Sequence, residues 1–176
     1  MNRSEPANHA PLVISLILLG VVARISPHPW NATPVMAIAL FAGTYLSKRW
    51  AIILPLIIVA STDLLLGWHA TIPFTWGAFA LTGMLAWWIR MRPGPLRIVG
   101  GAAAGSTLFF LLTNFGVWLT GGLYPRTADG LWRCYVAAVP FFRGTLAGDA
   151  IFTVAFFGGY AVLTGRVAAR GTFPPP

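Results

Sequence analysis

The sequence predicts an all-α integral membrane protein, built as one bundle of six transmembrane helices. Composition is the first reason, because 57% of the 176 residues are apolar and only 9% are charged, whereas a soluble domain carries about a quarter charged residues. The second reason is that the apolar residues fall into six runs separated by proline, glycine and basic residues. At roughly 20 residues for each spanning helix, the chain is long enough for about six spans. We therefore expect one membrane domain over residues 11–167, with short tails over 1–10 and 168–176.

The first three apolar runs are the shorter ones. They cover about 11–25, 33–46 and 50–66. Pro11 and Pro34 stand where a first-turn proline belongs, because the missing N–H costs nothing there, whereas Pro55 lies inside the third run and should kink it. The first two runs are short for a hydrocarbon core of about 30 Å, so we expect tilt, local thinning or a buried broken helix there. The first run also resembles a secretory signal, but we expect it to be retained as the first helix.

The last three apolar runs enclose a long segment of mixed character. They cover about 73–89, 96–119 and 145–167. Between the fifth and sixth runs, residues 121–142 combine aromatic residues with glycine and proline, and they are apolar enough to pack but too short to span. We expect an ordered outer loop or short helix that covers the bundle, ends at Pro140, and turns Trp132 and Tyr135 toward a cavity. Long ordered loops in compact proteins are usually binding loops.

Basic residues are distributed unevenly over the alternate loops. Eight fall on the side of the N-terminus: Arg3, Lys48, Arg49, Arg90, Arg92, Arg97, Arg166 and Arg170. Four fall on the other side: Arg24, Arg126, Arg133 and Arg143. This bias places both termini in the cytoplasm. Because the basic residues are scattered between apolar runs, the net charge of +8 indicates topology and not nucleic-acid binding.

Polar residues of other kinds gather at the outer ends of the helices. The expected ligand-binding residues are His28, Asn31, Asp63, Trp68, His69, Asn114, Tyr124, Trp132, Tyr135 and Arg143. A carboxylate at membrane depth is costly unless it is paired or hydrated, so Asp63 and Asp149 should pair with Arg24 or Arg143. Such pairs either tie helices together or rim an outward pocket. The tryptophans and tyrosines are explained either by an interfacial belt or by a pocket for an aromatic or macrocyclic ligand.

Metal and catalytic motifs give weaker signals. His28, His69 and Asp63 have side chains that bind zinc, but no HExxH or CxxC spacing supports a metal site. We expect neither a bound metal nor a cofactor. Cys134, the single cysteine, should be a small buried residue, and ligation of a corrinoid cobalt is the remote alternative. An enzyme that uses Asp63, His69 and His28 remains an alternative function.

Four stretches carry a family resemblance: RISPHPWNATPVMAIALFAG, STDLLLGWH, FFLLTNFGVWLTGGLYPRTADGL and CYVAAVPFFRGTLAGD. They resemble a bacterial family of small six-helix membrane proteins related to the substrate-binding S components of energy-coupling-factor vitamin transporters. The resemblance implies a six-helix bundle in the bacterial inner membrane and a cavity that opens outward. His28, Asp63 and Arg143 are also loosely similar to the solitary cobalamin-binding S components, although the cobalt-ligating cysteine of those proteins has no counterpart in WHATIPFTWGAFA.

The expected function is therefore uptake of a small vitamin-like nutrient, with cobalamin or another corrinoid as the leading ligand. The first run, LVISLILLGVVARI, lacks the small-xxx-small stripe that S components often use to dock on a shared energising module. A solitary protein or a different docking face is expected in consequence. An accessory subunit of a membrane complex, whose outer loops bind another protein, is a further alternative.

Overall fold

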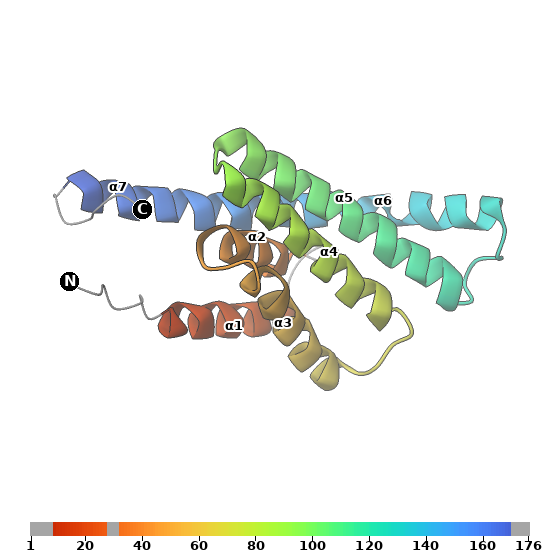
Figure 1. The fold of residues 1–176 in the computed structure, drawn as a ribbon. Helices are drawn as coiled ribbons and strands as arrows, with labels where there is room; N and C mark the ends of the chain where they lie inside the picture. The colour runs from red at the N-terminus through yellow and green to blue at the C-terminus, as the bar shows by residue number, and fades with distance from the viewer. Residues whose placement is uncertain (1–8, 28–31, 170–176) are drawn as a thin grey trace.

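The computed structural model describes residues 9–27 and 32–169, and there the chain is all-helical, as predicted (Figure 1). The helices are α1 (Ala10–Ile25), α2 (Val35–Tyr45), α3 (Trp50–Leu66), α4 (Ile72–Met91), α5 (Pro95–Thr120), α6 (Ala128–Thr153), the π-helical η2 (Val154–Gly158) and α7 (Gly159–Ala169). Because α6, η2 and α7 follow one another without a break, this part of the chain forms six continuous helices. Helices that are neighbours in sequence pack together from α3 to α6. The start of α1 and the end of α7 lie at the same end of the molecule (Figure 1).

Helix α2 is the centre of the bundle. It contacts α1, α3, α4, α5, α6 and η2, and every residue from Val35 to Thr44 is buried. Its side chains are small where neighbours come close: a Cβ added at Gly43 would lie 2.5 Å from the Cβ atoms of both Ala51 and Ala86. With 11 residues, α2 is short and buried, but it is one unbroken helix and not the buried broken helix that the run suggested.

The expected lid over residues 121–142 is wrong. Only residues 121–127 form a connection, and the remainder is the beginning of α6. The helix begins there because Thr127 is a good N-cap: its hydroxyl accepts a hydrogen bond from the Gly130 N–H at 3.1 Å. Pro140 lies inside α6 instead of ending a segment before it. A proline removes one backbone hydrogen bond and bends a helix. The turns on both sides of Pro140 are nevertheless helical, so α6 continues through it.

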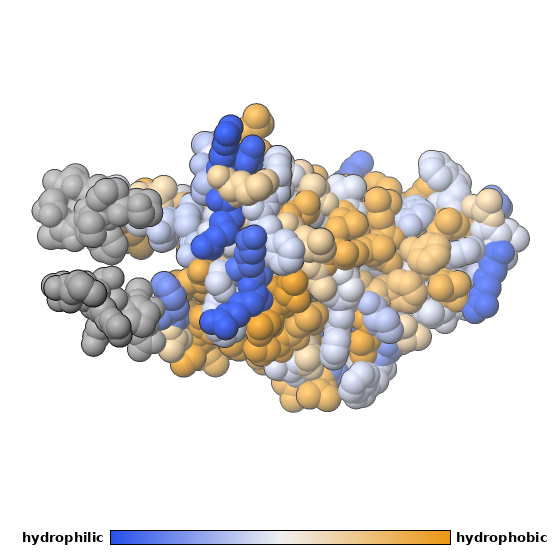
Figure 2. Space-filling model, in the orientation of Figure 1, coloured by the Kyte–Doolittle hydropathy of each residue, from blue (hydrophilic) through white to orange (hydrophobic). Residues whose placement is uncertain are grey.

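Three helices are long and apolar enough to cross a membrane, by length and composition: Ile72–Met91, Pro95–Thr120 and the continuous Ala128–Gly165. Helices α1, α2 and α3 are shorter but also apolar. Many large apolar side chains face outward, including Ile14, Leu18, Leu96 and Ile151, and Figure 2 shows extensive hydrophobic surface along the bundle. Such an exterior suits contact with lipid, because contiguous apolar patches of this extent are rare on soluble monomers.

Basic residues hold together the end of the bundle where α2 meets α3 and α4 meets α5. Arg90 of α4 donates to the carbonyl oxygens of Thr44 at 3.0 Å and Gly43 at 3.4 Å, at the C-terminus of α2, where a cation is favoured by the helix dipole. Lys48 lies 5.8 Å from the ring centroid of Trp87, and Arg97 lies 5.2 Å from that of Trp88. Figure 2 shows a hydrophilic stripe across this region.

Candidate functional site

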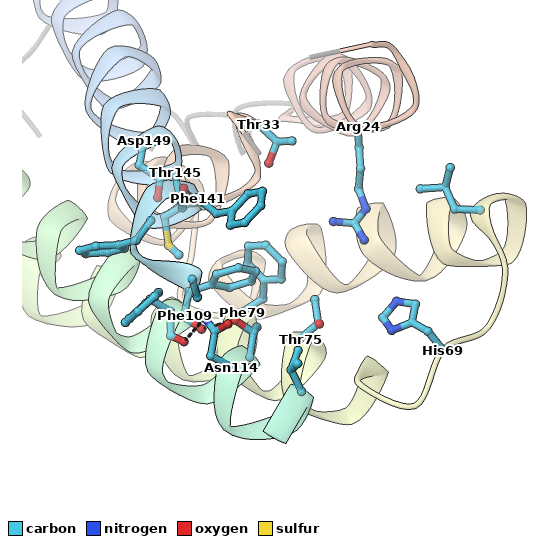
Figure 3. A pocket seen from close by; sticks show the side chains of 17 residues that line it. Arg24, Thr33, His69, Thr75, Phe79, Phe109, Asn114, Phe141, Thr145 and Asp149 are labelled. Carbon is cyan, nitrogen blue, oxygen red and sulfur yellow. Dashed lines mark hydrogen bonds between the residues drawn. The ribbon is translucent and has the colours of Figure 1, made fainter. Parts of the chain in front are cut away.

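A cavity of about 510 Å³ opens on the opposite side of α2 from this basic end. Residues from α1, α2, α3, α4, α5 and α6 line it (Figure 3). The lining residues are Arg24, Thr33, Met36, Leu66, His69, Thr75, Phe79, Phe109, Phe110, Thr113, Asn114, Val117, Ala138, Phe141, Phe142, Thr145 and Asp149. Its volume falls in the range of roughly 300–1,000 Å³ that is usual for small-molecule sites.

One wall of the cavity is an ion pair between α1 and α3. Arg24 Nη2 donates to Asp63 Oδ1 at 2.6 Å, and Trp76 Nε1 of α4 donates to Asp63 Oδ2 at 2.8 Å. Arg24 Nε also donates to the Thr62 hydroxyl at 2.7 Å. The Asp63 side chain is only 3% exposed, whereas that of Arg24 is 17% exposed and reaches the cavity. The predicted pairing of Asp63 with Arg24 is confirmed, and Asp63 acts on the cavity through the arginine that it holds.

The second carboxylate is arranged differently. Asp149, on α6, is 3% exposed, and its Oδ2 accepts a hydrogen bond from the Ser106 hydroxyl of α5 at 2.6 Å. The expected partner Arg143 is exposed and forms no ion pair with it within the described residues, so that part of the prediction is wrong. Positions 143 and 149 differ by six residues, which places them on different faces of an α-helix. Among the described residues, no cation therefore pairs with Asp149 at the cavity.

Aromatic rings form most of the apolar wall. Phe79 and Phe109 are 4.9 Å apart between ring centroids, and Phe110 and Phe142 are 4.7 Å apart. Beside them, Asn114 uses its amide N–H to bond the Phe110 carbonyl at 2.8 Å. Its side-chain oxygen is a hydrogen-bond acceptor on the same amide group. The wall thus combines phenyl faces with a few polar groups, as is typical of ligand pockets.

Of the predicted site residues, His69 and Asn114 line the cavity. His69 comes from the connection after α3 and shares a 2.7 Å hydrogen bond between Nδ1 and the Thr71 hydroxyl. His28 and Asn31 lie outside the described residues. Trp68, Tyr124, Trp132, Tyr135 and Arg143 do not line the cavity.

The aromatic residues that were expected to face the cavity lie elsewhere. Trp68 and Trp132 are 72% and 68% exposed as whole residues, so both lie on the outer surface. The Tyr135 hydroxyl donates to the Leu111 carbonyl at 2.9 Å and ties α6 to α5. Cys134 is buried and donates to the Asn114 carbonyl at 3.4 Å, a packing role that matches its default interpretation.

The phenylalanines were missed, although the sequence carries a signal for them. Ala138, Phe142, Thr145 and Asp149 recur every three or four residues, which is one face of an α-helix. That face is visible only if 128–153 is recognised as a single helix. A helix boundary at Pro140 separates Ala138 from Phe142, Thr145 and Asp149 and hides this periodicity.

The family of unknown function DUF6580 matches residues 4–170. The chain belongs to this family. No curated protein and no solved structure matches it. The likeness to S components of vitamin transporters therefore stays a prediction.

In this DUF6580 protein, the cavity offers binding groups: a fixed guanidinium, a buried carboxyl group, amide and hydroxyl groups, and phenyl faces. Within residues 9–27 and 32–169, no three His, Cys, Asp or Glu side chains gather as a metal site. The proposed triad of His28, His69 and Asp63 includes one residue outside those ranges. Asp63 is already committed to Arg24 and Trp76.

Proposed function

We propose that the protein binds a small, vitamin-like organic molecule in this cavity and helps to carry it across the bacterial inner membrane. The observation that carries the proposal is the guanidinium of Arg24 at the cavity wall, held by the buried Asp63 at 2.6 Å. A buried ion pair is costly to assemble, and polar groups at membrane depth generally mark a binding or transport path. A purely structural tie between α1 and α3 needs no cavity beside it.

The proposed topology has six spans and both termini in the cytoplasm. In its favour, the basic residues Lys48, Arg90 and Arg97 lie at one end, where the connections α2–α3 and α4–α5 meet, and positive residues favour the cytoplasmic side. The cavity is on the other side of α2 and faces outward in this topology. The energy source is either a separate energising module or none, in a solitary carrier.

The cavity volume bears on the ligand class. A space of about 510 Å³ favours a compact vitamin-like molecule over a corrinoid, whose macrocycle and nucleotide tail are larger. Cobalamin thus remains a prediction from resemblance alone. The phenyl walls favour a ligand with a flat or apolar body, and the polar groups would fix its orientation.

A matched pair of threonine substitutions on α5 tests the proposal. Thr113 lines the cavity and Thr107 faces outward, and each hydroxyl bonds the carbonyl four residues earlier at 2.8 Å. Thr113→Trp fills the cavity, whereas Thr107→Trp adds the same ring outside it. Cells that express each variant are supplied with a panel of radiolabelled B vitamins, cobalamin included, and uptake is measured.

We expect the wild type and Thr107→Trp to accumulate one member of the panel, and Thr113→Trp to lose that uptake at equal membrane expression. If Thr113→Trp takes up the vitamin as well as Thr107→Trp does, the cavity is not the transport site. If wild-type cells accumulate no vitamin beyond vector controls, the uptake function itself is wrong.

A further inference from the structure

We infer that the cavity selects an organic cation, with Asp149 as the counter-charge for an ammonium or similar group of the ligand. This inference rests on the proposed function only in taking the cavity as a binding site. It adds the charge of the ligand and the end of the cavity at which that charge sits.

The charge balance of the lining is the first reason. Arg24 and Asp149 carry the formal charges among the described residues that line the cavity. The charge of Arg24 is matched by Asp63 at 2.6 Å, so the guanidinium and its carboxylate together contribute almost no net charge. Asp149 has a neutral partner, the Ser106 hydroxyl, at 2.6 Å. An occupied site is therefore balanced when the ligand brings one positive charge.

The position of Asp149 is the second reason. Its Oδ2 accepts a hydrogen bond from the neutral Ser106 hydroxyl, and Asp149 lines the cavity, where the charged group of a ligand can reach it. An ionised carboxylate that is buried with one neutral donor is destabilised by lost hydration. A cation that enters the cavity supplies the missing partner, and the gain is realised only when the ligand is bound. Figure 3 shows Asp149 on one side of the cavity and Arg24 on the other, so the two groups do not compete.

The aromatic lining is the third reason. Phe79, Phe109, Phe110, Phe141 and Phe142 line the cavity from α4, α5 and α6. The face of a phenyl ring attracts a cation within about 6 Å of its centroid, and more strongly when both are shielded from water. A carboxylate or phosphate gains nothing from these faces. The phenyl walls and the single carboxylate thus favour the same sign of ligand charge.

The test uses the full chain, purified in detergent, and three probes that share one phenylpropyl body. These are 3-phenylpropylammonium, 3-phenylpropanol and 4-phenylbutanoate, whose end groups are cationic, neutral and anionic. Affinity is measured by isothermal titration calorimetry at pH 7. The rise in unfolding temperature of the protein when a probe is added gives a second measure, because it increases with ligand occupancy. Asp149→Asn removes the counter-charge at constant shape, and Asp129→Asn, at an exposed carboxylate on the same helix, is the control.

We expect the ammonium probe to bind about ten-fold more tightly than the alcohol, which is the effect of one well-placed charge interaction. The preference should fall to about two-fold or less in Asp149→Asn and persist in Asp129→Asn, because only the former charge lies in the cavity. The wild-type ratio of ammonium to alcohol is measured without any variant, so a failure of Asp149→Asn to fold leaves the inference open to refutation.

Three other outcomes overturn the inference in distinguishable ways. Equal binding of the alcohol and the ammonium probe, abolished by Thr113→Trp, retains the binding cavity but removes the charge selection. Preferred binding of the carboxylate probe assigns recognition to Arg24 and rejects Asp149 as the counter-charge. Failure of all three probes to bind wild-type protein rejects both the charge selection and the cavity as a general binding site.

Discussion

A double-mutant cycle on Arg24 and Asp63 measures how strongly the cavity wall is held. Arg24→Met removes the guanidinium and leaves Asp63, whose side chain is 3% exposed, with the Trp76 N–H as its remaining donor. Removing one partner of a buried pair costs about 3–5 kcal/mol. Asp63→Asn is milder, at about 1–3 kcal/mol, because the Arg24 side chain is 17% exposed and lines the cavity, so its charge is less completely desolvated.

The double variant loses the interaction only once, so the cycle should show a coupling of about 2 kcal/mol or more between the two residues. Equilibrium unfolding in mixed micelles, followed by far-ultraviolet circular dichroism, gives the four free energies of unfolding. Arg133 and Asp129 provide the control cycle, since they pair at 2.8 Å with side chains that are 68% and 63% exposed. Exposed i,i+4 pairs contribute about 0.3–0.5 kcal/mol. A coupling for Arg24 and Asp63 no larger than that of the control would refute the buried ion pair.

The other predictions concern packing, topology and the outer surface. Gly43→Ala should lower the free energy of unfolding by about 1–3 kcal/mol, because its Cβ would lie 2.5 Å from Ala51 and Ala86. Gly100→Ala, whose new Cβ would meet no atom within 4 Å beyond its own helical turn, should raise it by up to about 1 kcal/mol in the same assay. Reporter fusions at both termini should give cytoplasmic signals, and a periplasmic signal at the C-terminus excludes six spans. Trp132→Ala should leave ligand uptake unchanged, because the residue is 68% exposed and does not line the cavity.

Composition alone predicts a helical membrane protein, because the physical reason for helices in lipid does not depend on tertiary contacts. Lipid requires that backbone groups be satisfied within each segment, so long apolar runs must be helices. The pairing of Arg24 with Asp63 is predictable for a related reason. Both stand near the predicted outer ends of their runs, the first and the third, which cross in the same direction in a six-span topology, and an isolated charge at that depth is expensive. The predicted topology and the cost of an isolated charge therefore leave few basic residues that could pair with Asp63.

The positions of individual side chains around the cavity depend on details that composition does not fix. Pro140 is compatible with both a helix end and a bend within a helix, and the choice between them decides where residues 128–139 lie. A helix end at Pro140 implies a lid that contains Trp132 and Tyr135, whereas a continuous helix places Ala138 and Phe142 on one face. The continuous helix instead lets α6 line the cavity on both sides of Pro140, from Ala138 to Asp149, while Trp132 and Tyr135 lie outside the lining.

The short length of α2 explains why a cavity exists at this depth. Eleven residues extend about 17 Å at 1.5 Å per residue, roughly half of a hydrocarbon core of about 30 Å. The C-terminus of α2 is fixed at the basic end by Arg90, so the helix fills only the part of the bundle nearest that end. Thr33 and Met36, before and within its first turn, line the cavity, which places the cavity where a full-length helix would continue. The longer helices α4, α5 and α6 extend beyond the N-terminus of α2. Their phenylalanines line the cavity there.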